Sequence, residues 1–268
     1  MARLKLAVCQ APAEMHAGDR GWRKLVARVR ALRPDVLLLN EMPFGPWLAS
    51  SPSCDLAALQ QSHAFHREGV ARLADFEVPV VLGSRATREN GRSVNQGFLW
   101  TPEQGVTALH TKQFFPDEPG YYEARWYERG ETRFVVGEAN GLRVGFLICT
   151  DVWFTEWARY YGRRGVHLIA VPRATPRPSL DRWKIGIAAA ALVSGCYVAS
   201  SNRAGRGSSG QLFGGRGWIV DPSGRFLAET SSREPVAAAF IDLDLAEESK
   251  KEYPRYVSDP FREAGPPG

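Results

Sequence analysis

One cysteine of this sequence stands where an enzyme could use it as a nucleophile. Cys149 directly follows the apolar run 142–148, which reads as a buried strand. A cysteine nucleophile reacts as the thiolate and therefore needs a base or a positive charge nearby. A cysteine next to an apolar run is otherwise more often a small buried hydrophobic residue, and Cys9 and Cys196 fit that description. The interpretation of Cys149 therefore depends on its partners.

Glu41 and Lys112 are the candidate partners. Glu41 comes just after the apolar run 36–39 and precedes Met-Pro-Phe-Gly. A carboxylate in such an apolar turn is poorly solvated, which suits it to act as a general base near neutral pH. Lys112 follows the predicted strand 106–111 and precedes Gln-Phe-Phe-Pro, where its charge could stabilise an oxyanion. The alternatives are a solvent-exposed loop acid and a surface lysine.

The elements that must position these residues alternate between strands and helices. Predicted strands cover residues 4–9, 35–39, 78–82, 96–100, 106–111, 142–148, 167–171, 197–201, 217–220 and 237–242, and predicted helices cover 21–32, 64–76, 155–162 and 180–194. Strand–helix alternation with antiparallel hairpins between predicts a layered α/β sandwich. Because no linker, repeat or low-complexity tract interrupts the pattern, we expect a single domain over residues 1–268.

Composition excludes several classes of function. The formal charge is +5, but the basic residues are scattered among acids, which favours a solvated surface over a nucleic-acid site. The four cysteines lie far apart with no CxxC pair, as expected of reduced thiols in the cytoplasm, with no metal site. The first residues read as a strand rather than a signal peptide. No run of about 18 apolar residues is present, so we expect no membrane span.

The strand ends and their surroundings resemble the nitrilase superfamily of carbon–nitrogen hydrolases. The similar stretches are 39–43, 110–116 and 145–154, followed by 198–203 and 214–224. The resemblance implies an α-β-β-α sandwich, usually dimerised into four layers, in a homodimer or a larger homo-oligomer. It also implies that Glu41, Lys112 and Cys149 are catalytic and that neither a metal nor another cofactor is needed.

A fourth catalytic residue comes with the resemblance. The stretch Pro-Asp-Glu-Pro-Gly-Tyr-Tyr-Glu at 116–123 is similar to the carbamylputrescine amidase branch, which makes Glu123 the second glutamate and Glu118 the competing choice. The implied activity is cysteine-dependent hydrolysis of a linear amide or N-carbamoyl amine through a thioester, on a small-molecule substrate. The alternatives are a nitrilase and a catalytically silent interaction module.

Four residues are candidates for substrate binding. The backbone N–H of Thr150 could stabilise an oxyanion, and Tyr122 and Trp153 could form an aromatic rim. Amino-acid carbamoylases of the superfamily place arginines just after the cysteine to hold a carboxylate, but Val152 and Trp153 stand there in this chain. Arg173 is the remaining candidate for that charge.

Two other patterns are set aside. Residues 205–210 fit GxGxxG, but the following stretch does not favour a helix, so we expect no dinucleotide site. His63 and His66 lie three apart on a predicted helix with no third ligand nearby. We expect them at the surface rather than on a metal.

Overall fold

Strand β1 (Arg3–Pro12) shows how the sequence builds a buried sheet in the computed structural model, which describes residues 3–258. Successive side chains of a strand point to opposite faces. Leu6 and Val8 join the core between two sheets, whereas Ala7 and Cys9 join the core beneath helix α1 (Arg20–Leu32). The strand is therefore covered on both faces, which explains its uninterrupted apolar run.

The strands form two sheets that are joined by one strand pair. The first has the order β5–β4–β3–β2–β1–β13, and the second has the order β6–β7–β8–β9–β11–β12, with β10 beside β9. Their bounds are β2 Val36–Leu38, β3 Val80–Glu89, β4 Arg92–Thr101, β5 Gly105–Thr111, β6 Gly137–Ala139, β7 Leu142–Phe146, β8 Leu168–Arg173, β9 Tyr197–Arg206, β10 Leu212–Gly214, β11 Trp218–Val220, β12 Phe226–Glu229 and β13 Val236–Asp242. The sheets join where the end of β1 pairs with β9.

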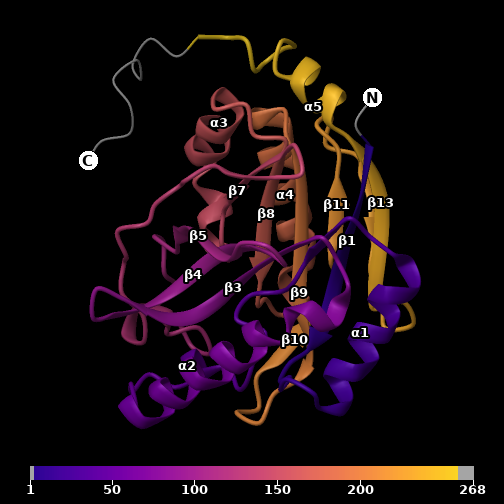
Figure 1. Ribbon diagram of the computed structural model, residues 1–268. Helices are drawn as coiled ribbons and strands as arrows, with labels where there is room; N and C mark the ends of the chain where they lie inside the picture. Colours follow the sequence, from indigo (N-terminus) through magenta and orange to yellow (C-terminus); the bar gives the residue numbers. More distant parts are fainter. Residues whose placement is uncertain (1–2, 259–268) are drawn as a thin grey trace.

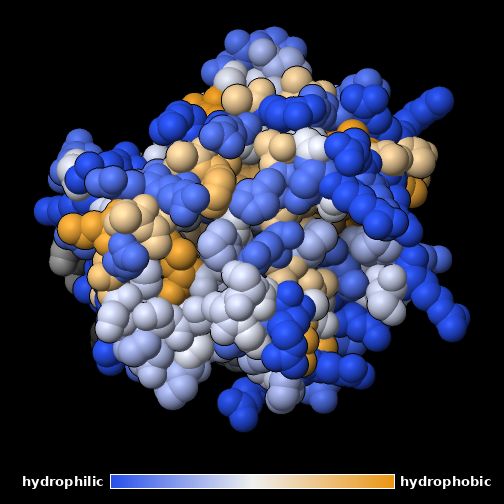
Figure 2. Space-filling view, turned by 90° about the horizontal axis from the view of Figure 1, so that it is seen from below, coloured by the Kyte–Doolittle hydropathy of each residue, from blue (hydrophilic) through white to orange (hydrophobic). Residues whose placement is uncertain are grey.

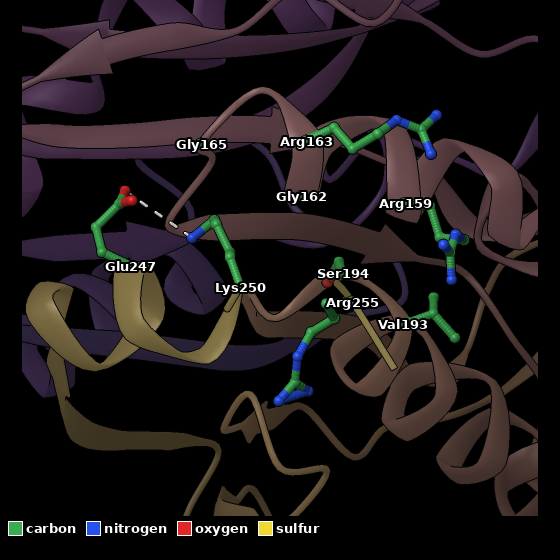
Figure 3. Close-up of a pocket in the computed structure, with 9 residues that line it drawn as sticks. All are labelled: Arg159, Gly162, Arg163, Gly165, Val193, Ser194, Glu247, Lys250 and Arg255. Carbon is green, nitrogen blue, oxygen red and sulfur yellow. Dashed lines mark ion pairs between the residues drawn. The ribbon is translucent and has the colours of Figure 1, made fainter. Parts of the chain in front are cut away.

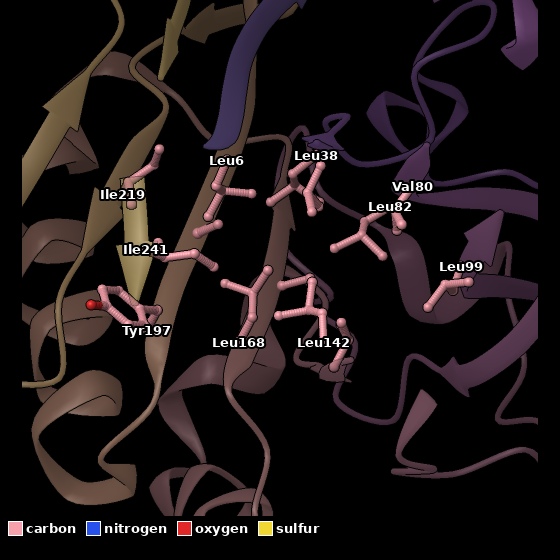
Figure 4. Packing of buried hydrophobic residues seen from close by; sticks show 14 of the residues in the cluster. Leu6, Leu38, Val80, Leu82, Leu99, Leu142, Leu168, Tyr197, Ile219 and Ile241 are labelled. Carbon is pink, nitrogen blue, oxygen red and sulfur yellow. The ribbon is translucent and has the colours of Figure 1, made fainter. Parts of the chain in front are cut away.

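Helices cover the outer face of each sheet (Figure 1). Helix α1 and helix α2 (Leu56–Ala71) pack on the first sheet, and α3 (Thr155–Arg163) and α4 (Leu180–Ser194) pack on the second. A short helix, α5 (Leu243–Ser249), follows β13. Leu6 and Leu38 of the first sheet lie beside Leu142 and Leu168 of the second (Figure 4). This arrangement confirms the predicted α-β-β-α sandwich; the ends of the predicted 1–268 domain lie outside the described residues.

The largest difference from the predicted elements is at α2. The helix begins at Leu56, not at residue 64, because the side chain of Asp55 caps it by accepting from the backbone N–H groups of Ala57 and Ala58. It ends at Ala71, and a 3₁₀ turn, η2 (Leu73–Phe76), completes the predicted range. Strands β6 and β10 and helix α5 were not predicted, since each is too short to show a clear period. Strand β12 is the second strand of the hairpin that 217–220 and the turn 221–224 predict.

His66 corrects a second expectation. It lies on α2 with 1% of its surface exposed, and its ring meets the ring of Phe44 edge-on. The prediction of a surface position is therefore wrong for His66, because this face of α2 packs against the loop after β2. His63 is half-buried.

The glycine-rich stretch 205–210 forms the turn of a hairpin between β9 and β10. The backbone N–H of Gly207 donates to the carbonyl of Gln211, and the next element is a strand. A dinucleotide-binding turn would lead into a helix, so this geometry differs from that site.

The surface mixes polar and apolar residues. The face seen from below in Figure 1 is mostly hydrophilic, with small hydrophobic patches between the polar residues (Figure 2). Among the helices described for residues 3–258, none has the length and apolar character needed to cross a bilayer.

Candidate active site

The ends of three strands bring Glu41, Lys112 and Cys149 into one buried region. Glu41 follows β2, Lys112 follows β5, and Cys149 follows β7 as the first residue of a 3₁₀ turn, η4 (Cys149–Trp153). Cys149 has a φ of 49°, and Met42, next to Glu41, has a φ of 40°. Non-glycine residues rarely adopt such left-handed backbone, and the strain it carries is concentrated at functional sites.

Lys112 is bound by two carboxylates. Its Nζ lies 2.9 Å from Oε1 of Glu41 and 2.8 and 2.7 Å from the two carboxylate oxygens of Glu123. Glu123 comes from a 3₁₀ turn, η3 (Glu123–Arg125), and none of the three side chains exposes more than 1% of its surface. Glu118, the competing candidate, is exposed at the surface. The geometry thus groups Glu123, not Glu118, with Lys112 and Glu41.

The two oxygens of Glu41 differ in their contacts. Oε1 accepts hydrogen bonds from Lys112 and from the side-chain amide of Asn95, at 2.8 Å. Oε2 is buried and has no hydrogen-bond partner within residues 3–258. An unpaired carboxylate oxygen in the interior is free to accept a proton.

The charges of this region act on one another strongly. Burial raises the pKa of the Cys149 thiol, the negative charge of Glu41 raises it further, and Lys112 opposes both. Burial alone would lower the pKa of Lys112, but the carboxylates of Glu123 and Glu41 outweigh it and raise that pKa. Burial also raises the pKa of Glu123, against the effect of Lys112. The resting cysteine is therefore a neutral thiol beside a permanently charged lysine.

Asp151, which the sequence did not single out, joins the cysteine turn to the lysine segment. Its carboxylate accepts from the backbone N–H groups of Ile148, Gln113 and Phe114, at 3.0 to 3.2 Å. It also accepts from Nε2 of His110 at 2.9 Å, since Nδ1 of His110 accepts from the N–H of Phe134. In the sequence, the only sign of a role for Asp151 is that an acidic residue stands two positions after Cys149.

A pocket of about 260 Å³ opens onto Cys149. Its lining comprises Pro116, Glu118, Tyr121, Glu123, Cys149, Thr150, Trp153, Ala174, Thr175, Pro176, Ser179, Arg182 and Trp183. Thr150 and Trp153, both predicted substrate-binding residues, are among them. Tyr121 stands where we expected Tyr122, whose ring instead lies under the guanidinium of Arg125 at 4.7 Å. Neither Arg182 nor Trp183 was predicted.

Arg173 lies behind the wall of this pocket and is fully buried. Its guanidinium donates to Oγ of Ser200, Oγ1 of Thr175 and the carbonyl of Arg216. This placement does not support the predicted contact with a substrate carboxylate, because protein acceptors already engage its donors.

A second pocket, of about 290 Å³, lies between α3, α4 and the segment around α5 (Figure 3). Its charged residues are Arg159, Arg163, Glu247, Lys250 and Arg255, and it contains none of the predicted site residues. Within residues 3–258, no group of three or more His, Cys, Asp or Glu is placed to hold a metal ion. The pocket at Cys149 is therefore the candidate active site.

Comparison with known proteins shows the family of the chain. The model of the family described as carbon-nitrogen hydrolase matches residues 5–251. The chain is 31% identical to a 2-oxoglutaramate amidase of Bacillus subtilis (strain 168), over 66% of this chain and 67% of that protein. It is 29% identical to an N-carbamoylputrescine amidase of Arabidopsis thaliana, over 86% of this chain and 83% of that protein.

Solved structures share the fold. A carbon-nitrogen hydrolase from Helicobacter pylori G27 superposes with a TM-score of 0.84 at 20% identity, covering 97% of this chain and 96% of that one. An amidase mutant from Nesterenkonia sp. AN1, with the acetamide moiety of fluoroacetamide attached to its active-site cysteine, has a TM-score of 0.75 at 20% identity, covering 91% and 92%. The fold of the present chain is thus the nitrilase-like fold of carbon–nitrogen hydrolases.

The chain belongs to the carbon–nitrogen hydrolase family. It is an amidohydrolase that acts on carbon–nitrogen bonds other than peptide bonds, which confirms the predicted family and enzyme class.

Proposed function

We propose that the protein hydrolyses a linear amide or N-carbamoyl amine through a thioester on Cys149. One observation carries the proposal: the buried Glu41–Lys112–Glu123 group lies beside Cys149, a cysteine with a left-handed backbone conformation that lines a pocket. The amidases among the relatives support amide chemistry ahead of nitrile chemistry.

In this mechanism, Oε2 of Glu41 accepts the proton of Cys149 as the thiolate attacks the carbonyl carbon. Lys112 and the backbone N–H of Thr150 stabilise the oxyanion. The carbon–nitrogen bond then breaks as Glu41 returns the proton to the departing ammonia or amine, which leaves the thioester. Glu41 next takes a proton from water, the hydroxide attacks the thioester, and the acid leaves as the thiol is restored. Glu123 holds Lys112 in place.

The pocket supports a small substrate. Tyr121, Trp153 and Trp183 supply aromatic surface, and Glu118 and Arg182 place charges of opposite sign at its mouth. Such a lining suits a short chain with a polar end, and the reacting amide must reach Cys149 at the base.

The test is ammonia release from matched amide, N-carbamoyl and nitrile substrates by the purified protein. We expect turnover of an amide or N-carbamoyl compound and much slower turnover of the matched nitrile. Cys149→Ser should fold normally but lose activity by several orders of magnitude, since a hydroxyl is a far weaker nucleophile in a site built for a thiolate. If the serine variant kept more than about a tenth of the turnover, a barrier change of only ~1.4 kcal/mol, Cys149 would not be the nucleophile. A silent interaction module would release no ammonia at all.

We further propose that the protein acts in the cytoplasm as a homodimer. The four cysteines are unpaired, and Cys54 is exposed, which suits a reducing compartment. Exposed apolar residues on α4, discussed below, support the dimer.

A further inference from the structure

Arg173 is a second buried cation next to the nucleophile. It ends β8, which pairs in parallel with β7, the strand that leads to Cys149. The backbone of Ala174, the next residue, hydrogen-bonds the Cys149 thiol, and the carbonyl of Arg173 accepts from the N–H of Glu41 at 3.3 Å. Arg173 is therefore fixed between nucleophile and base, although its side chain does not line the pocket.

The hydrogen-bond acceptors that surround the guanidinium are neutral. It donates to Oγ of Ser200 at 2.6 Å, Oγ1 of Thr175 at 2.9 Å and the carbonyl of Arg216 at 2.6 Å, and it lies 4.1 Å and 5.5 Å from the ring centres of Trp218 and Trp183. Arg216 itself has a φ of 68°, so a strained residue presents one of these acceptors. These three acceptors and two indole rings, called the Arg173 cage below, hold the guanidinium in place.

The charge of Arg173 is not balanced by a partner. Lys112 forms ion pairs with two carboxylates, whereas Arg173 forms no ion pair within residues 3–258. A buried charge without a counterion is costly and is usually removed or paired. Keeping one beside Cys149 suggests that an anion forms there during the reaction.

The first chemical step creates such an anion. Proton transfer from Cys149 to Glu41 moves one negative charge from the carboxylate to the sulfur. Burial lowers the pKa of Arg173 to about 9, so it stays charged at neutral pH; negative charge on Cys149, once its thiol has ionised, opposes this lowering, and so does the carboxylate of Glu41. Interaction between charges is mutual, so a positive Arg173 stabilises negative charge on the sulfur of Cys149.

We propose that Arg173 is a positioning residue that stabilises the Cys149 thiolate from behind the pocket wall without contacting the substrate. The inference rests on the proposed function, since it assigns the residue to the thiolate-forming step. The charged and titratable groups that act on Cys149 come from several elements: Glu41 after β2, Lys112 after β5, Tyr121 in the following loop, Glu123 in η3 and Arg173 in β8. Asp151 in η4 acts on Lys112.

The test is the pH dependence of Cys149 alkylation by iodoacetamide, followed by peptide mass spectrometry in a Cys54→Ala background. We expect Arg173→Met and Arg173→Gln to raise the pH midpoint by about one unit or more, which slows alkylation at pH 7 by about tenfold. Arg173→Lys keeps the charge and should stay within about half a unit of the parent. Ser200→Ala removes one acceptor of the cage but keeps the cation, and it should lower stability without moving the midpoint.

Unchanged midpoints in folded Arg173→Met or Arg173→Gln would overturn the proposal, and so would equal shifts in the methionine and lysine variants. If neither neutral variant folds, the lysine variant decides, because a rise of one unit despite its retained charge would contradict an electrostatic role. A change confined to the KM of anionic amides would instead assign Arg173 to substrate binding. Alkylation requires no turnover, so this result is separate from failure of the parent protein to release ammonia.

Discussion

At the scale of single residues, the site pairs buried charges, each of which would cost free energy if it were buried without a partner. Lys112 neutralises one of two buried carboxylates, and the second leaves the group negative, which opposes formation of a thiolate. Glu41 resolves this conflict if it takes the thiol proton as attack begins, because the total charge then stays constant. We therefore propose different tasks for the two glutamates, although both bind the same ammonium.

Substitution of each glutamate by glutamine separates these tasks. Glu41→Gln should reduce acylation at least a thousandfold, equivalent to ~4 kcal/mol, because no other residue of the group offers an unpaired oxygen for the thiol proton. Glu123→Gln should lower turnover by misplacing Lys112 while alkylation of Cys149 continues. Single-turnover assays with an amide and with an ester, whose leaving group needs no protonation, measure the contrast.

The amide and ester results control for each other. Glu123→Gln should slow the amide and the ester by similar factors, since the orientation of Lys112 affects both. In Glu41→Gln the loss should be larger for the amide than for the ester, whose leaving group needs no protonation, although the ester also stays slow because the thiol has no base. If Glu123→Gln blocked alkylation while Glu41→Gln did not, the two roles would have to be exchanged.

At the scale of the elements, the strands were predictable and the connections between them were not. Apolar runs that end in Glu41, Lys112 and Cys149 could be read directly, because a strand buried on both faces has a strong local signal. Asp151 and the cage of Arg173 depend on contacts between segments far apart in the chain. Local sequence carries no sign of such pairing, so these residues could not be assigned.

The burial of His66 on helix α2 also depends on contacts with a distant segment, and it makes the stability of the protein depend on pH. The Nδ1–H of His66 donates to the carbonyl of Ser62, and its Nε2 has no partner within residues 3–258. Burial lowers the pKa of His66 to about 3, with a smaller contribution from Arg203. In the unfolded chain the pKa is about 6.5, so below that pH the unfolded state binds a proton that the folded state does not. Stability is therefore retained above pH 6.5 and lost as the pH falls toward 3.

His66→Asn should remove this pH dependence, since the amide can still donate to Ser62 but does not titrate. Between pH 6.5 and 4.5 we expect the parent protein to lose ~2 kcal/mol more free energy of unfolding than the variant does. Urea unfolding at the two pH values measures the difference, in which contributions from other groups cancel. Equal losses in both proteins would mean that His66 takes up a proton in the folded state.

At the scale of the whole molecule, α4 presents two large apolar residues to solvent, whereas α2 presents one, Leu56 at its first position. The inner face of α4 packs on the second sheet through Trp183, Ile187 and Ala190. Its outer face exposes Ile185 and Leu192, which lie about two helical turns apart. A helix that is apolar on both faces is typically buried on both. The side chain of Trp153 packs against α4 near Trp183, which brings this outer surface close to the active-site pocket.

We therefore expect a dimer in which α4 of one chain covers α4 of another, giving the predicted four layers. Ile185 and Leu192 are 69% and 42% exposed in the single chain, and a charge on each would have to be buried unpaired in such an interface. Ile185→Glu/Leu192→Glu should elute as a monomer, whereas the parent protein should show twice the 29.7 kDa chain mass by light scattering. Leu56→Glu/Leu212→Glu is the matched control, with exposures of 70% and 48% on α2 and β10, and it should remain dimeric. If the control dissociated and the α4 variant did not, the interface would lie at α2 or β10 rather than at α4, and the dimer expected here would be excluded.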